Sequence, residues 1–139
     1  MESRLSHPLV TVGRTDVFVT VDLTGQQVAD AKRAPVNLVL VLDRSGSMSG
    51  EKLEQAKQAA RHLVRQLQPQ DRLAIVHYGS DVKSLASLRA TPENQSRMVN
   101  YINGIADDGG TNIGSGLEEG RAQLLTGVSE YKVNRIILI

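Results

Sequence analysis

The sequence predicts an α/β fold in which a mostly parallel sheet is flanked by helices. Segments 36–42 and 73–78 are nearly continuous aliphatic runs, and runs of this length are typical of strands buried on both faces. Segment 51–68, between them, has the apolar spacing of an amphipathic helix instead. Valine, isoleucine and leucine dominate the apolar residues, while the chain has one Phe, three Tyr and no Trp. Such a composition is typical of parallel sheets covered by helices.

The N-terminal part contains one further predicted strand. Residues 17–23 alternate apolar and polar side chains, which is the period of a half-buried strand. The polar stretch 26–35 is typical of a loop. We therefore divide the chain into residues 1–35, a strand region with a linker, and residues 36–139, the main domain.

Local signals predict how the first helix ends and how the next strands connect. Pro69 ends the helix of 51–68, because proline lacks the amide hydrogen that a helix interior needs. Strand 73–78 is followed by a turn at 79–81. That turn is short enough to form a hairpin with segment 82–85.

Two more helices and a final strand complete the predicted order. Thr91 before Pro92 is the pattern of a helix N-cap followed by proline at the first helical position. A third helix is predicted over 114–125 and a last strand over 135–139. The residues of the third helix expected to face the core are Ile113, Leu117, Leu124 and Leu125.

Charge, cysteine content and hydropathy exclude several classes of protein. The formal net charge is +1, without the positive surplus that nucleic-acid binding needs. No cysteine is present, which excludes disulfide scaffolds, zinc ribbons and thiol nucleophiles. No stretch approaches the ~20 apolar residues of a membrane span. The N-terminus lacks the apolar core of a signal peptide, which favours a cytoplasmic location.

A polar turn follows the most buried strand, at the edge where α/β sheets bind ligands. Asp43 ends this strand, and Ser45 and Ser47 follow at two-residue steps. One carboxylate and two hydroxyls form an all-oxygen donor set, which suits Mg²⁺ or Mn²⁺ better than zinc or copper. The turn therefore predicts a site for a hard divalent cation.

Three segments together resemble the von Willebrand factor A domain, also called the integrin I-like domain. Segment 42–48, Leu-Asp-Arg-Ser-Gly-Ser-Met, resembles the D-x-S-x-S signature of that family. Segment 109–112, Gly-Gly-Thr-Asn, resembles its second metal loop, and segment 68–76 resembles the junction between its first helix and next strand. Their order and spacing match over residues 36–139. The resemblance implies a Rossmann-like fold.

The resemblance also implies a metal-ion-dependent adhesion site. By this likeness Asp43, Ser45, Ser47 and Thr111 would surround a Mg²⁺ or Mn²⁺, directly or through water. Neutral hydroxyl ligands would leave the ion strongly electrophilic, so that it would accept an Asp or Glu side chain of a partner protein. The implied function is a protein-binding module of the adhesion or scaffold kind, and not an enzyme.

The chain departs from the family pattern at its end. The family usually adds another aspartate just after the strand that matches 135–139, and this chain ends at Ile139. We therefore expect a partial domain without the family's later strands and helices, and a weakened metal affinity. Strand 135–139 would then be an exposed edge capable of pairing with a second copy of the chain.

Plainer interpretations of the same residues stay open. The Asp43 turn could only form and cap a bend before the first helix, which would make the chain a structural fragment without metal. A metal-dependent hydrolase is the least favoured alternative, because no general base is placed beside the turn. Asp107 and Asp108 are expected to be solvated loop residues. His77, in an apolar strand, is expected to be a core or edge histidine.

Overall fold

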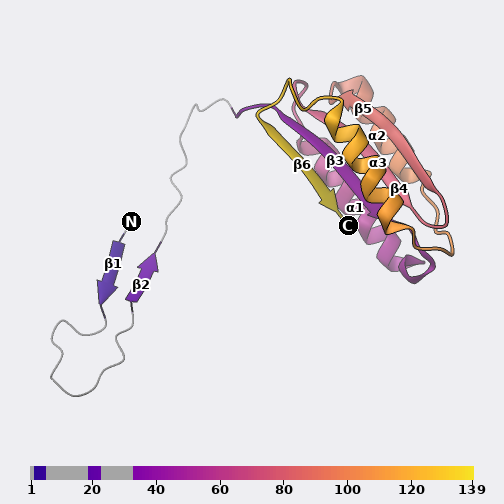
Figure 1. The fold of residues 1–139 in the computed structure, drawn as a ribbon, viewed down its shortest axis with the longest axis horizontal. Coiled ribbons are helices and arrows are strands. Elements are labelled where there is room, and N and C mark those ends of the chain that lie inside the picture. The colour runs from indigo at the N-terminus through magenta and orange to yellow at the C-terminus, as the bar shows by residue number, and fades with distance from the viewer. Residues whose placement is uncertain (1, 6–18, 23–32) are drawn as a thin grey trace, which may run out of the picture. The chain divides into compact units, whose positions relative to one another are not determined.

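The structure, a computed structural model, describes residues 2–5, 19–22 and 33–139 (Figure 1). By its internal contacts the chain forms two compact units, Met1–Lys32 and Arg33–Ile139. In the first unit, β1 (Glu2–Leu5) pairs antiparallel with β2 (Val19–Asp22).

The strand predicted over 17–23 is present at 19–22, and Val17, Phe18 and Leu23 lie outside the described residues. β1 was not predicted. Its sequence, Glu-Ser-Arg-Leu, has no apolar alternation that could indicate a strand, so only its pairing with β2 reveals it.

Four strands form the sheet of the second unit, in the order β5-β4-β3-β6. β4 and β6 both run parallel to β3, and β5 runs antiparallel to β4. The mostly parallel sheet is thus confirmed, and so is the hairpin between β4 and β5. The strand bounds are β3 Val36–Asp43, β4 Arg72–Tyr78, β5 Val82–Arg89 and β6 Val133–Leu138.

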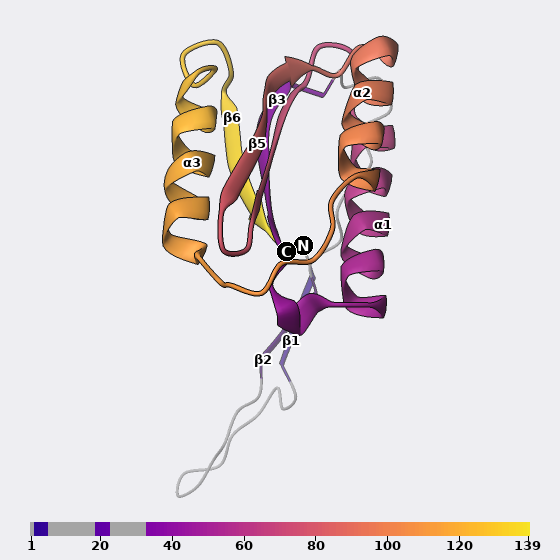
Figure 2. The same cartoon turned by 90° about the vertical axis from the view of Figure 1, so that its right-hand side faces the viewer.

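The helices cover both faces of this sheet: α1 and α2 lie on one face and α3 on the other (Figure 2).

The predicted N-cap of α2 is confirmed, since the Thr91 hydroxyl accepts a hydrogen bond from the amide of Asn94 at 3.4 Å. Within the described residues, no helix combines the length and the apolar character needed to cross a membrane. The bounds are η1 Gly46–Met48, α1 Glu51–Gln66, α2 Pro92–Asn103 and α3 Ile113–Leu125.

β3 is one of the two inner strands of the four-stranded sheet, and its two faces belong to separate cores. Leu38 and Leu40 lie in the core that includes Met98 of α2, while Val39 and Val41 lie in the core under α3. This is the two-residue period of a strand. Both faces of β3 are buried. The end of this strand, where the chain leaves the sheet, is therefore held firmly in place.

The packing of α3 corrects one prediction. Ile113, Leu117 and Leu125 were expected to face the core, but they are 43%, 38% and 51% exposed. Of the four residues expected there, Leu124 is the one that packs against the core under this helix. The apolar residues of α3 therefore do not mark its buried face.

Two glycines form that buried face instead. A Cβ at Gly116 would lie 2.7 Å from Cδ1 of Tyr78, and a Cβ at Gly120 would lie 2.8 Å from Cγ2 of Val41. The backbone of α3 therefore lies directly on β3 and β4. With glycine toward the sheet, Ile113, Leu117 and Leu125 are exposed, and Leu124 is the large side chain that still packs inward.

β6 lies at one edge of the sheet, next to β3, as predicted for strand 135–139. Its residues Ile136 and Leu138 are 37% and 48% exposed. Pairing of this edge with a second copy of the chain stays a prediction.

Candidate functional site

The Asp43 turn directly follows β3 at the carboxyl edge of the sheet. Oδ1 of Asp43 accepts a hydrogen bond from the amide of Ser45 at 2.7 Å, which folds the turn back onto the end of the strand. Oγ of Ser45 lies 3.1 Å from Oγ of Ser47. Ser45 is buried and Ser47 is exposed, so this group of oxygens reaches from the interior to the surface.

The loop that carries Thr111 lies beside this turn. Asp108 pairs with Ser45 in an isolated parallel bridge, and its amide donates to the carbonyl of Arg44 at 2.8 Å. Thr111 itself is exposed, and in residues 33–139 no hydrogen bond joins it to the three predicted ligands of the turn. The structure thus links three of the four predicted ligands and places the fourth on the neighbouring loop.

The Thr111 loop is also held against the turn between β4 and β5. The amide of Gly110 donates to Oγ of Ser80 at 3.0 Å, and the amide of Asn112 donates to the carbonyl of Gly79 at 2.9 Å. A Cβ at Gly110 would lie 2.7 Å from Cα of Ser80. Only glycine permits this approach, which explains the second glycine of the sequence motif. A Cβ at Gly109 would meet nothing within 4 Å.

The donor atoms of the Asp43 turn fit a hard divalent cation. Neighbouring oxygen ligands of an octahedral Mg²⁺, each about 2.1 Å from the ion, lie about 3 Å apart, and the two serine hydroxyls are 3.1 Å apart. In the part of the chain that the structure describes, no three His, Asp or Glu side chains gather in a way that could hold a metal ion. The possible metal ligands at the turn are one carboxylate, from Asp43, and two hydroxyls, from Ser45 and Ser47.

These residues do not cap the first helix, although Asp43 does form the bend that the plainer interpretation expects. The N-cap of α1 is Gly50, with φ of 77°, and it carries no side-chain capping bond. Ser45 precedes η1 and makes no capping bond to it either. The serine hydroxyls contact each other rather than the free amides of α1.

Tyr78 is a residue of the site that sequence analysis missed. It lies opposite Asp43 in the register of β3 and β4, and it is 2% exposed. Burial raises the pKa of its phenol, and the Asp43 carboxylate raises it further. The available signal was that both residues end neighbouring predicted strands, which places them side by side at one edge.

Arg44 and Asp108 are also residues that sequence analysis missed. Arg44 is 6% exposed, and its Nη2 contacts the carboxylates of Asp81 and Asp108. A hydrogen bond from the Ser80 amide to Asp108, 2.8 Å long, and the Arg44 charge lower the pKa of Asp108. Asp108 is thus a partly exposed loop residue whose carboxylate is bonded to these groups, whereas Asp107 is exposed as expected.

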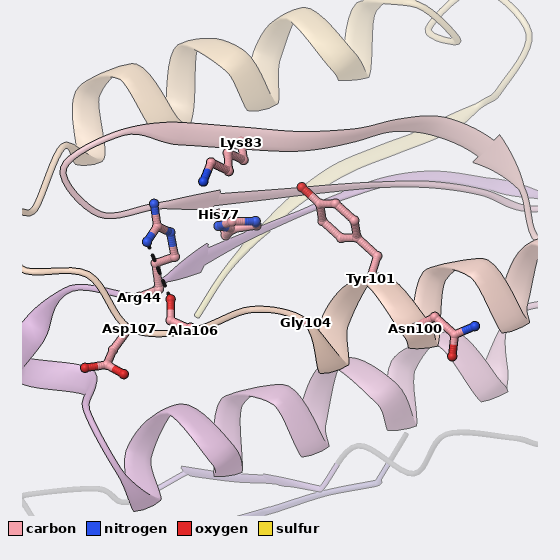
Figure 3. A pocket seen from close by; sticks show the side chains of 8 residues that line it. All are labelled: Arg44, His77, Lys83, Asn100, Tyr101, Gly104, Ala106 and Asp107. Atoms are coloured by element: carbon pink, nitrogen blue, oxygen red, sulfur yellow. Dashed lines mark hydrogen bonds between the residues drawn. The ribbon is translucent and has the colours of Figure 1, made fainter.

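A pocket of about 350 Å³ lies beside the turn on the face that α2 covers (Figure 3). Arg44, His77, Lys83 and Tyr101 are among its lining residues. The rings of His77 and Tyr101 are 5.5 Å apart, and Nδ1 of His77 has no hydrogen-bond partner among the described residues. His77 is thus the core histidine that the sequence predicted, with a pocket against its ring.

Acidification below pH 6.5 is expected to destabilise the fold through His77. Burial, followed by the positive charges of Arg44 and Lys83, lowers the pKa of His77 from 6.5 to about 4. Between these values the unfolded chain binds a proton that the folded chain does not, so the free energy of unfolding falls as the pH falls. We expect a loss of about 2 kcal/mol between pH 6.5 and about pH 5, measured by urea unfolding at constant ionic strength.

His77→Phe is the matched variant for this pH dependence. Phenylalanine keeps a ring against Tyr101 and removes the titrating group, so the slope above about pH 5 should flatten. Carboxylates with a lowered pKa, such as Asp108 and Glu119, lose their contribution only at lower pH. An unchanged slope in His77→Phe would contradict the assignment.

Comparison with known proteins finds one domain family and several larger proteins. The family model described as von Willebrand factor type A domain matches residues 37–139. Inter-alpha-trypsin inhibitor heavy chain H3 from Homo sapiens is 35% identical over 101 residues, which are 71% of this chain and 11% of that protein. E3 ubiquitin-protein ligase WAVH1 from Arabidopsis thaliana is 41% identical over 88 residues, which are 63% of this chain and 13% of that protein.

Among solved structures, the pilus adhesin SpaC from Lactobacillus rhamnosus GG in its open conformation is similar, with a TM-score of 0.66 and 23% identity. The match covers 78% of this chain and 15% of the adhesin chain. At this identity the likeness is one of fold. The chain spans about a tenth of the length of the inter-alpha-trypsin inhibitor heavy chains that it matches.

Proposed function

We propose that this chain, which belongs to the von Willebrand factor type A domain family, is a protein-binding module that holds Mg²⁺ or Mn²⁺ at Asp43, Ser45, Ser47 and Thr111. Its partner would present an Asp or Glu side chain to the ion. Domains of this family mediate protein–protein interaction and adhesion, often with a metal ion. The observation that carries the proposal is the group of turn oxygens at the carboxyl edge of the sheet.

Each residue of the turn has a distinct part in this proposal. Asp43 supplies negative charge, and the hydrogen bond from the Ser45 amide fixes the orientation of its carboxylate. Ser45 and Ser47 supply neutral oxygens at a spacing that suits neighbouring ligand positions. When bound, the ion supplies a Lewis-acidic centre with an open position for a partner carboxylate. With a single carboxylate among these four residues, we propose a modest affinity for the metal.

Adding Mg²⁺ or Mn²⁺ is expected to stabilise the wild-type chain and to leave Asp43→Ala unaffected. An ion that binds only the folded state raises the free energy of unfolding, by about 2.7 kcal/mol at a concentration of 100 times Kd. Asp43→Ala removes the only carboxylate of the set, so this increase should disappear. Thermal unfolding at a series of concentrations of each ion measures the effect.

Ser49→Ala is the matched control, because Ser49 is an exposed serine just beyond the turn and is not a proposed ligand. Its response to both ions should equal that of the wild type. A wild-type chain that responds to neither ion, or an Asp43→Ala variant that keeps the response, would exclude the metal role. Once a response is measured, immobilised peptides with Asp or Glu, compared with Asn or Gln counterparts, test the partner.

The two alternative functions give different outcomes in the same experiment. A structural fragment without metal would lose stability in Asp43→Ala, by ~1 kcal/mol as for other local turn and cap interactions, equally with and without the ions. A hydrolase would need a general base near the turn. His77 lies opposite Leu42 in the strand register, on the other face of the sheet from Asp43, so our proposal is a non-enzymatic one.

A further inference from the structure

Arg44 occupies the position between two of the proposed ligands, Asp43 and Ser45, but its side chain points away from them. The side chain is 7% exposed and lies on the face of the sheet that α2 covers. There its Nη2 contacts Asp81, in the turn between β4 and β5, and Oδ2 of Asp108 at 3.3 Å. One guanidinium therefore contacts the two loops that border the Asp43 turn.

The contacts of Asp108 extend this link to the Thr111 loop. The Asp108 carboxylate accepts hydrogen bonds from the amides of Ser80 at 2.8 Å and Gly109 at 3.0 Å. The Asp108 amide donates to the carbonyl of Arg44 at 2.8 Å. Arg44 thus holds Asp108 by both its backbone and its side chain, and Asp108 lies three positions before Thr111.

The packing around these groups leaves little room for another arrangement. A Cβ at Gly79 would lie 2.9 Å from Cβ and from Oδ2 of Asp108, and 3.3 Å from Cζ of Arg44. A buried guanidinium is costly unless carboxylates compensate its charge. Arginine presents several donors in a rigid planar fork, which lets it contact two carboxylates on separate loops, as lysine with its single ammonium does less well.

We infer that Arg44 is a positioning residue of the metal site, which holds the Thr111 loop against the Asp43 turn through Asp108 and Asp81. The effect on metal affinity rests on the proposed function. The effect on the loop does not, because every contact that carries it lies within the chain itself. Losing a group that orients metal ligands typically lowers metal affinity by 10–100-fold.

Arg44→Met tests the inference, because methionine fills similar space without a hydrogen-bond donor. Amide hydrogen exchange without metal should become at least about tenfold faster at Asp108, Gly110 and Asn112, whose amides tie the loop to its neighbours. The amide of Ala90, bonded to the carbonyl of Asp71 away from this loop, should be unchanged. In the presence of Mg²⁺ or Mn²⁺, affinity measured by calorimetry should fall about tenfold or more.

Lys83→Met is the matched control, since Lys83 contacts Asp81 at 3.3 Å but neither Asp108 nor the Thr111 loop. It should change neither exchange at the loop nor metal affinity. Asp81→Asn removes the negative charge of one exposed partner of Arg44 and should give an intermediate effect on loop exchange and on metal affinity. The Asp81→Asn variant therefore tests the inference if Arg44→Met does not fold.

The outcomes separate this inference from the proposed function. Unchanged exchange at Asp108, Gly110 and Asn112 in Arg44→Met, or in Asp81→Asn if the first variant does not fold, would overturn the inference even if the wild type binds metal. A wild type that binds neither ion would overturn the proposed function, while faster loop exchange would still support the positioning role of Arg44. Equal effects of Lys83→Met and Arg44→Met would also overturn the inference, because they would indicate a general charge effect.

Discussion

Asp71→Ala is expected to lower the free energy of unfolding by about 2–4 kcal/mol. Asp71 is fully buried just before β4. Its carboxylate accepts hydrogen bonds from the amides of Gln68 at 2.7 Å and Val36 at 3.0 Å, and from Nη1 of Arg33 at 3.1 Å. Alanine would remove the acceptor of the two amides, which costs about 1–3 kcal/mol for each donor left unpaired. The Arg33 side chain is 42% exposed and would bond to water instead.

The carboxylate joins residues 33–36 to residues 68–71, two segments that are far apart in the sequence. Burial alone would raise the pKa of Asp71, but the hydrogen bonds from Arg33, Gln68 and Val36 outweigh it, and the pKa is lowered. The group is therefore stabilised as a carboxylate. Its contribution is present above the ordinary pKa of aspartate, about 3.9, and is lost as the pH falls below it.

Urea unfolding near neutral pH measures the loss in Asp71→Ala, with Asp107→Ala as the control. Asp107 is exposed in a loop, so its substitution should change stability by less than about 0.5 kcal/mol. Asp71→Asn should be strongly destabilising too, because the NH2 group of asparagine is itself a donor and would face the donors that the carboxylate accepts from. A loss below about 1 kcal/mol in Asp71→Ala would show that this carboxylate does not anchor the fold.

Gly116→Ala and Gly114→Ala are expected to change stability in opposite directions, although both glycines lie in α3. A Cβ at Gly116 would lie 2.7 Å from Cδ1 and 3.1 Å from Cβ of Tyr78. Either the ring or the helix must move, which typically costs about 1–3 kcal/mol. A Cβ at Gly114 meets nothing within 4 Å. Alanine there should stabilise the chain by about 0.5 kcal/mol, because it reduces the conformational entropy of the unfolded state.

Thermal and urea unfolding of both variants tests this pair. Gly116→Ala should also weaken the response to Mg²⁺ or Mn²⁺, because Tyr78 lies beside Asp43 in the strand register, whereas Gly114→Ala should keep it. If both substitutions stabilised the chain, the close packing of α3 on β4 would be wrong.

Much of the fold could be predicted because the signals are local. The aliphatic runs of β3 and β4, the helical spacing of α1 and the Thr91–Pro92 cap each depend on residues close together in the chain. The buried face of α3 could not be predicted in this way. Hydropathy favours Leu117 as an inward residue, but a helix packed through Gly116 exposes it. Glycine carries no hydrophobic signal, so its role is visible only in the contact with Tyr78.

The same distinction between local signals and tertiary contacts applies to the residues of the candidate site. Asp43, Ser45 and Ser47 could be predicted together, because they lie within one turn at the end of a recognisable strand. Arg44 and Asp108 are ordinary polar residues in the sequence and are 64 positions apart. Their contact at 3.3 Å depends on the fold bringing the loop of Asp108 beside the end of β3.

The sequence by itself determined the main strands and helices of residues 36–139 and where the chain places its hard oxygen donors, since both depend on the local order of residue types. The tertiary structure alone decided which face of α3 is buried, why Asp71 must be an aspartate, and how the Thr111 loop is held beside the Asp43 turn. The physical reason is that these features depend on close approach and charge compensation between residues distant in the chain. Composition and periodicity do not record such contacts.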